Sequence, residues 1–130
     1  MQPDIAVGRW PVSEVEQVED LVARTIAYES GSAVNRAVFA ADGTEAYFEG
    51  IAQRLATDYL SEETQSDILT GASSAEVADS INEGAWFTAY VGHGSITQWG
   101  KEDIFTLDSV DSLEKITPPI VLQLTCLTGL

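Results

Sequence analysis

Short apolar runs alternate with amphipathic segments along the chain, and this alternation most constrains the fold. The runs at residues 36–41, 85–91 and 119–125 are rich in β-branched, aromatic or small apolar residues and do not alternate strictly. Such runs are typical of parallel strands that are buried on both faces. Residues 4–7 (Asp-Ile-Ala-Val) form a further short candidate strand. We therefore expect an α/β fold with a mainly parallel sheet.

Helical spacing of apolar positions predicts helices over residues 13–29, 45–60, 73–84 and 109–113. Two of these segments open on residues with the spacing of a capping box, Ser13 with Glu16 and Ser73 with Glu76. We expect the helices at 13–29 and 45–60 to pack on the sheet, because each has an apolar stripe to bury.

Composition limits the domain count and the class of partner. The 130 residues, 45% of them apolar, predict one globular domain spanning residues 1–130. The chain carries 21 acidic residues against six Lys and Arg, a net charge of −15, which argues against nucleic-acid binding. A solvated acidic surface explains this charge, and a divalent-cation site or a preference for basic substrates are the alternatives. No apolar run approaches the ~20 residues of a membrane helix.

The single histidine and the single cysteine each follow a predicted strand. His93 comes directly after residues 85–91 and one glycine, and Cys126 comes directly after residues 119–125. The carboxyl ends of parallel strands meet at one edge of a sheet, where reactive groups collect. An imidazole beside a thiol favours the nucleophilic thiolate, so the two residues are candidates for a catalytic pair. An inert core cysteine and a loop histidine remain the alternatives.

The motifs around these residues resemble the gingipain family of cysteine peptidases. They are Tyr-Val-Gly-His-Gly-Ser at 90–95, Trp-Gly at 99–100 and Leu-Thr-Cys-Leu-Thr-Gly at 124–129. The opening at 4–12 and the Ile-Ala-Tyr-Glu at 26–29 are similar to further landmarks of that family. The likeness covers nearly the whole chain.

The resemblance implies a caspase-like three-layer α/β/α sandwich and cysteine endopeptidase activity. Cys126 would be the nucleophile and His93 the general acid and base, with the backbone amides of Gly94 and Cys126 as the oxyanion hole. Asp42 falls where some members carry a glutamate that orients the histidine, and Glu45 is a candidate for selecting basic residues. The family requires no cofactor, although a structural calcium is compatible with it. It also implies a protein or peptide substrate and a bacterial extracellular, cell-surface or periplasmic location.

Family domains begin before the strand at 4–7 and continue well past the cysteine, so the chain resembles a central, partial piece of such a domain. We therefore expect an incomplete sheet with exposed edges, and self-association into homo-oligomers. The alternative function is a catalytically silent caspase-like module that binds peptides or acts as a scaffold in a surface protein. An acidic α/β domain in which Cys126 and His93 never meet is the third hypothesis.

Overall fold

A computed structural model describes residues 8–31, 34–114 and 118–128, and the chain divides into two compact units. The first unit, Met1–Ser32, contains helix α1 (Val15–Ser30). This helix begins at Val15, so its capping box joins Glu14 and Gln17 instead of the predicted Ser13 and Glu16. The strand predicted at residues 4–7 lies outside the described residues. The packing of the 13–29 helix on the sheet stays a prediction.

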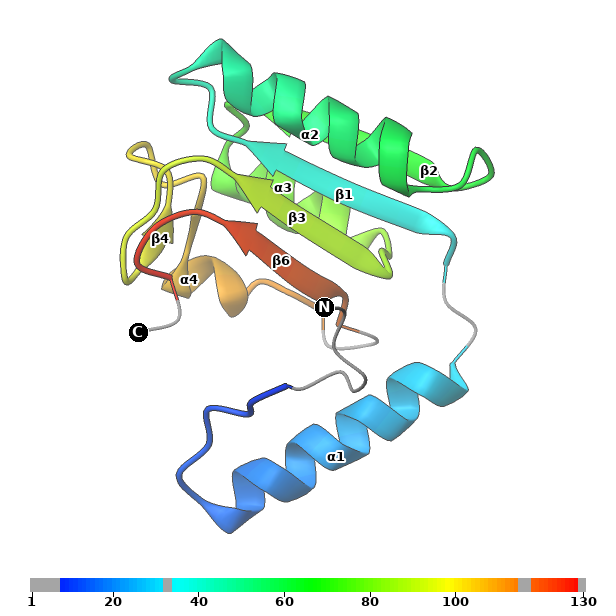
Figure 1. The fold of residues 1–130 in the computed structure, drawn as a ribbon. Coiled ribbons are helices and arrows are strands. Elements are labelled where there is room, and N and C mark those ends of the chain that lie inside the picture. Colours follow the sequence, from blue (N-terminus) through cyan, green and yellow to red (C-terminus); the bar gives the residue numbers. More distant parts are fainter. Residues whose placement is uncertain (1–7, 32–33, 115–117, 129–130) are drawn as a thin grey trace, which may run out of the picture. The chain divides into compact units, whose positions relative to one another are not determined.

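The second unit, Ala33–Leu130, is built on a four-stranded parallel sheet in the order β2-β1-β3-β6 (Figure 1). Its strands are β1 (Arg36–Ala41), β2 (Gln65–Thr70), β3 (Phe87–Val91) and β6 (Ile120–Leu124). All three neighbouring pairs are parallel, which confirms the pairing expected for the three predicted strands. Strand β2 was not predicted, because its polar residues hide the strand pattern.

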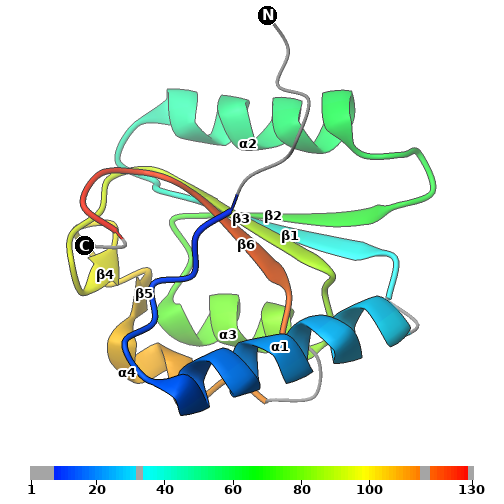
Figure 2. The same cartoon turned by 60° about the horizontal axis from the view of Figure 1, so that its bottom comes forward.

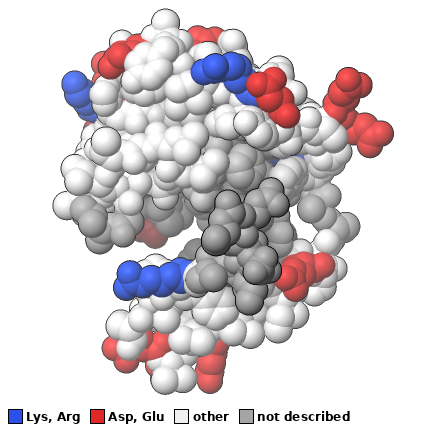
Figure 3. All heavy atoms as spheres, viewed as in Figure 1, with Lys and Arg blue, Asp and Glu red and all other residues white. Residues whose placement is uncertain are grey.

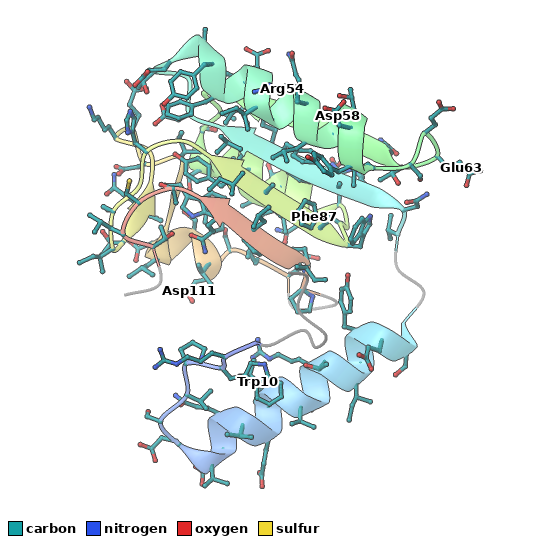
Figure 4. All side chains as sticks on the ribbon, in the orientation of Figure 1. Trp10, Arg54, Asp58, Glu63, Phe87 and Asp111 are labelled. Carbon is teal, nitrogen blue, oxygen red and sulfur yellow. The ribbon has the colours of Figure 1, made fainter. Side chains whose placement is uncertain are left out.

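Helices cover both faces of this sheet (Figure 2). Helix α2 (Ala46–Tyr59) packs on one face over a core that includes Phe39, Phe48 and Val91. Helix α3 (Ser74–Asn82) lies on the other face over a core that includes Val77 and Tyr90. The exposed charged residues Arg54, Asp58 and Glu63 belong to α2 and the loop after it (Figure 4). The unit is therefore an α/β sandwich of three layers, consistent with the caspase-like fold.

The ends of the shorter elements follow from their caps. Ser73 caps α3 in the predicted capping box with Glu76. A small antiparallel pair, β4 (Gln98–Trp99) and β5 (Phe105–Thr106), forms a hairpin after β3. The short helix predicted at 109–113 is α4 (Leu107–Val110), because the Thr106 hydroxyl accepts a hydrogen bond from the Ser109 amide and starts the helix earlier.

Strand β6 lies at the edge of the sheet formed by the described residues, and its side chains are exposed on both faces. The exposed fractions of Ile120, Val121, Leu122 and Leu124 are between 39% and 51%. The prediction that this run is buried on both faces is therefore wrong, whereas it holds for β1, whose six residues are all buried. The face of this unit that Figure 3 shows is largely uncharged, with acidic and basic side chains toward its margins. Among the described residues, no helix has the length and apolar character needed to cross a membrane.

Candidate active site

The ends of β3 and β6 bring His93 and Cys126 to the same edge of the sheet. The last residues in register are Val91 and Leu124, and each candidate lies two residues further along its own chain segment. The Gly92 amide donates to the Leu124 carbonyl at 3.3 Å, so the two segments stay adjacent beyond the last registered pair. His93 and Cys126 thus follow the carboxyl ends of two neighbouring parallel strands, where reactive groups commonly collect.

The His93 ring lies on the side of the sheet covered by α2. Its Nε2 is 3.1 Å from Oε1 of Glu45, the residue that precedes this helix. Its edge packs against the Phe48 ring with a centroid distance of 5.3 Å. The side chains of His93 and Glu45 are 41% and 47% exposed, so solvent screens their interaction. The acid in contact with the ring is Glu45 and not Asp42.

Asp42 instead holds the backbone of His93. Its Oδ2 accepts from the His93 amide at 3.2 Å, and its Oδ1 accepts from the amide and hydroxyl of Thr44 at 2.9 and 2.6 Å. The residue is only 1% exposed. Burial raises the pKa of this carboxyl, but the hydrogen bonds from Thr44 and His93 outweigh burial, and the net pKa is lowered.

The carbonyl of His93 is held as firmly as its amide. It accepts hydrogen bonds from the Tyr90 hydroxyl at 2.5 Å and from the Gly100 amide at 2.7 Å. Burial, and secondarily the nearby charge of Asp42, raises the pKa of Tyr90, so the hydroxyl keeps its proton and donates it. Both backbone polar groups of His93 are therefore fixed by buried side chains.

Gly94 brings this loop into contact with the cysteine segment. A Cβ at Gly94 would lie 2.3 Å from Oγ1 of Thr125 and 2.9 Å from the Cys126 carbonyl oxygen, so only glycine fits. Within the described part of the chain, neither the Gly94 amide nor the Cys126 amide donates a hydrogen bond. Two free N–H groups in adjacent segments are the kind of donors that stabilise an oxyanion.

Cys126 is a free, exposed cysteine. Its thiol makes no direct hydrogen bond to His93 among the described residues. That the two side chains lie within one contact or one bridging water stays a prediction.

The chain matches the model of peptidase family C25 over residues 1–130, its whole length. The chain belongs to this family. C25 is the gingipain family of clan CD, and membership places the chain among cysteine peptidases. No curated protein and no solved structure gives a significant match.

An uncharged cavity of about 380 Å³ lies under the hairpin of this C25 chain. Its lining includes Ile81, Trp99, Phe105, Val121 and Gln123, and contains no Asp, Glu, Lys or Arg among the described residues. The Trp99 Nε1 donates to the Gln123 Oε1 at 3.0 Å along this lining and so joins β4 to β6. The described residues also contain no cluster of three or more His, Cys, Asp or Glu that could hold a metal ion.

The residues that fix His93 were not singled out from the sequence. Tyr90 and Trp99 belong to the family motifs at 90–95 and 99–100, and Phe48 is an apolar position of the helix predicted at 45–60. Gln123 lies within the strand predicted at 119–125. Its polar side chain within the otherwise apolar Ile-Val-Leu-Gln-Leu of β6 is the sequence signal by which it could have been found.

Proposed function

We propose that the chain is a cysteine endopeptidase that uses Cys126 as nucleophile and His93 as general acid and base. The Cys126 thiolate attacks the peptide carbonyl carbon, and the Gly94 and Cys126 amides stabilise the oxyanion. His93 then gives a proton to the leaving amine. A water molecule deprotonated by His93 attacks the thioester, which releases the acid and restores the thiol.

The contact between Gly94 and the Thr125–Cys126 segment carries this proposal. Two amides without hydrogen-bond partners, those of Gly94 and Cys126, lie in adjoining segments at the sheet edge where His93 follows β3 and the exposed Cys126 follows β6. With Nε2 of His93 against Glu45, Nδ1 is the ring nitrogen left to exchange protons with substrate. Family membership independently supports cysteine chemistry.

Glu45 is the acid that we assign to orienting the His93 ring. Its contact with Nε2 at 3.1 Å supports this role. Selection of basic residues by the same carboxylate is the competing role, because it remains 47% exposed. Asp42 acts as an orienter through the backbone of His93 rather than through its ring.

We further propose a peptide or protein substrate, no required cofactor and no nucleic-acid partner, with a structural calcium still compatible. We also propose an extracellular, cell-surface or periplasmic bacterial location, which is typical of the family. Self-association into a homo-oligomer is expected from the exposed β6.

The single cysteine makes the test unambiguous, because any covalent adduct of a thiol reagent must lie on Cys126. Peptidyl acyloxymethyl ketones would be reacted with the chain at pH 6 and adduct formation followed by mass spectrometry. An unactivated thiol with pKa near ~8.5 is only roughly 0.3% ionised at this pH. We expect fast labelling that falls at least tenfold in His93→Ala and is absent in Cys126→Ser. Ile96→Ala, an exposed position in the same loop, is the control and should label normally.

A fluorogenic peptide panel on the same proteins measures turnover. Labelling no faster than that of a simple thiol, unchanged by His93→Ala, would refute the peptidase proposal. Peptide binding without labelling would favour the catalytically silent module, for which the lack of a direct hydrogen bond between His93 and Cys126 is the supporting observation.

A further inference from the structure

We infer that Gln123 is a positioning residue that couples the histidine loop to the cysteine strand through Trp99. The inference rests on the proposed function, because it concerns the alignment of His93 with Cys126. Gln123 lies on β6, three residues before the cysteine, whereas Trp99 lies on β4, in the hairpin that follows the histidine. Their hydrogen bond therefore spans the two segments that carry the proposed reacting pair.

Among the residues that the structure describes, no other hydrogen bond joins the β4–β5 hairpin to β6. The cavity of about 380 Å³ separates the apolar side chains of the two elements, and both Trp99 and Gln123 line it. Trp99 is 7% exposed, so its indole N–H would lose its protein partner at a mostly buried position if Gln123 could not accept. The 3.0 Å bond from Trp99 Nε1 to Gln123 Oε1 is consequently a specific link across incomplete packing.

The position of Trp99 affects that of His93 through two contacts. The indole stacks on the Tyr90 ring, with centroids 4.7 Å apart and planes 7° from parallel, and the Tyr90 hydroxyl donates to the His93 carbonyl. The residue after Trp99, Gly100, donates its amide to the same carbonyl at 2.7 Å. A shift of Trp99 therefore moves both donors that hold the His93 carbonyl.

Gln123 touches no reacting group, so its effect is on alignment alone. Misplacement of a reacting group by about 1 Å can cost on the order of 100-fold in rate. Loss of one hydrogen bond allows a smaller displacement, and we expect a loss of roughly tenfold. The loss of rate should occur only at pH values at which Cys126 needs His93 to form its thiolate.

The test compares Gln123→Met and Trp99→Phe with the parent chain. Met has the size of Gln but no acceptor of comparable strength, and Phe keeps an aromatic ring but lacks the indole N–H. Alkylation of Cys126 by iodoacetamide would be followed from pH 5 to pH 10. We expect each variant to react about tenfold more slowly at pH 6 and at the parental rate near pH 10, where any exposed thiol is ionised without help. The double variant should be no slower than either single one, because both remove the same bond.

Gln53→Met is the matched control, since the Gln53 side chain lies on the exposed side of α2 and donates a hydrogen bond to Glu49 in the same helix. It should alkylate as the parent does, and circular dichroism must show all variants folded. Parental rates at pH 6 in Gln123→Met, additive losses in the double variant, or equal losses at pH 6 and pH 10 would each overturn the inference. If His93→Ala also alkylates at the parental rate at pH 6, the proposed function itself fails. If only His93→Ala is slow, the proposed function stands and the role of Gln123 is refuted.

Discussion

Asp42 is the buried carboxylate that joins the end of β1 to the histidine loop. Asparagine at this position can still accept from Thr44, but its NH₂ would face the His93 amide, donor against donor. A mispaired buried group costs about 1–3 kcal/mol. The stabilisation by Asp42 depends on its ionised form, because the hydrogen bonds lower the pKa of Asp42 below its ordinary value.

We expect Asp42→Asn to lower the free energy of unfolding by about 1–3 kcal/mol at pH 7. A depressed carboxyl pKa gives stability that is present above the unfolded pKa of about 3.9 and is lost as pH falls through the folded pKa. The difference between parent and variant should therefore shrink below about pH 4. Urea unfolding between pH 7 and pH 2.5 measures it. Asp58→Asn on the exposed side of α2 is the control, and a difference that does not vary with pH would contradict the prediction.

Glu45 offers a second residue-scale test, which separates orientation from substrate selection. Exposed ion pairs are worth about 0.2–1 kcal/mol, or up to roughly fivefold in rate. If Glu45 orients the His93 ring, Glu45→Gln should slow the labelling of Cys126 by this factor. The slowing should be the same for a peptidyl ketone with Arg next to the reactive group and for one with Leu there. Slowing for the Arg reagent alone would assign Glu45 to specificity instead.

At the scale of elements, Arg36 joins β1 to β2 and α3. Its guanidinium donates to the carbonyl oxygens of Ser80 and Gly84, and forms ion pairs with Asp67 and Glu83. The Arg36 side chain is 6% exposed, while the side chains of Asp67 and Glu83 are 32% and 72% exposed. Removing one member of a buried ion pair costs about 3–5 kcal/mol, and the exposed partners place this site at the lower end.

We expect Arg36→Met to lower the free energy of unfolding by about 3 kcal/mol, because it strands two carbonyl oxygens and the Asp67 carboxylate. Chemical denaturation measures the change, with Arg54→Met on the exposed side of α2 as the matched control. A loss below 1 kcal/mol, or an equal loss in the control, would show that water replaces the guanidinium at no cost.

The elements that could be predicted are those with a strong local pattern. Strands β1 and β3 are apolar and buried, and α3 carries its capping box, so local rules suffice for them. Strand β2 and the β4–β5 hairpin are short or polar, and only their pairing with β1 and with each other defines them. The exposure of β6 depends on its place at the sheet edge, which no residue pattern encodes.

The candidate site divides in the same way. The ends of the predicted strands place His93 and Cys126 at one edge of the sheet. The glycines beside His93 indicate that the backbone comes close to another segment there. Which acid meets the ring depends on the path of the chain into α2, and Glu45 reaches it where Asp42 turns to the backbone. The link from Gln123 to Trp99 joins residues 24 positions apart and follows only from the folded hairpin.

For the molecule as a whole, an apolar edge and a strong net charge oppose each other. Strand β6 exposes Ile120, Val121, Leu122 and Leu124. Charged residues and prolines commonly protect edge strands from pairing with other chains, and β6 contains neither. The net charge of −15 repels a second copy over a Debye length of about 10 Å at 0.1 M salt. Salt screens this repulsion and leaves the attraction between apolar edges unchanged or stronger.

We therefore expect the chain to self-associate through β6, and to do so more strongly as ionic strength rises. Leu122→Lys puts a charge on this edge and should shift the equilibrium to monomer, with the dissociation constant raised at least tenfold, since an unpaired lysine at an apolar contact is costly to desolvate. Tyr59→Lys, which makes the same charge change at an 80% exposed residue at the end of α2, is the control. Sedimentation velocity across a range of concentrations, at 0.05 and 0.5 M salt, measures both. A chain that stays monomeric at high concentration and high salt, or an equal effect of the two lysines, would show that β6 is not the surface that holds copies together.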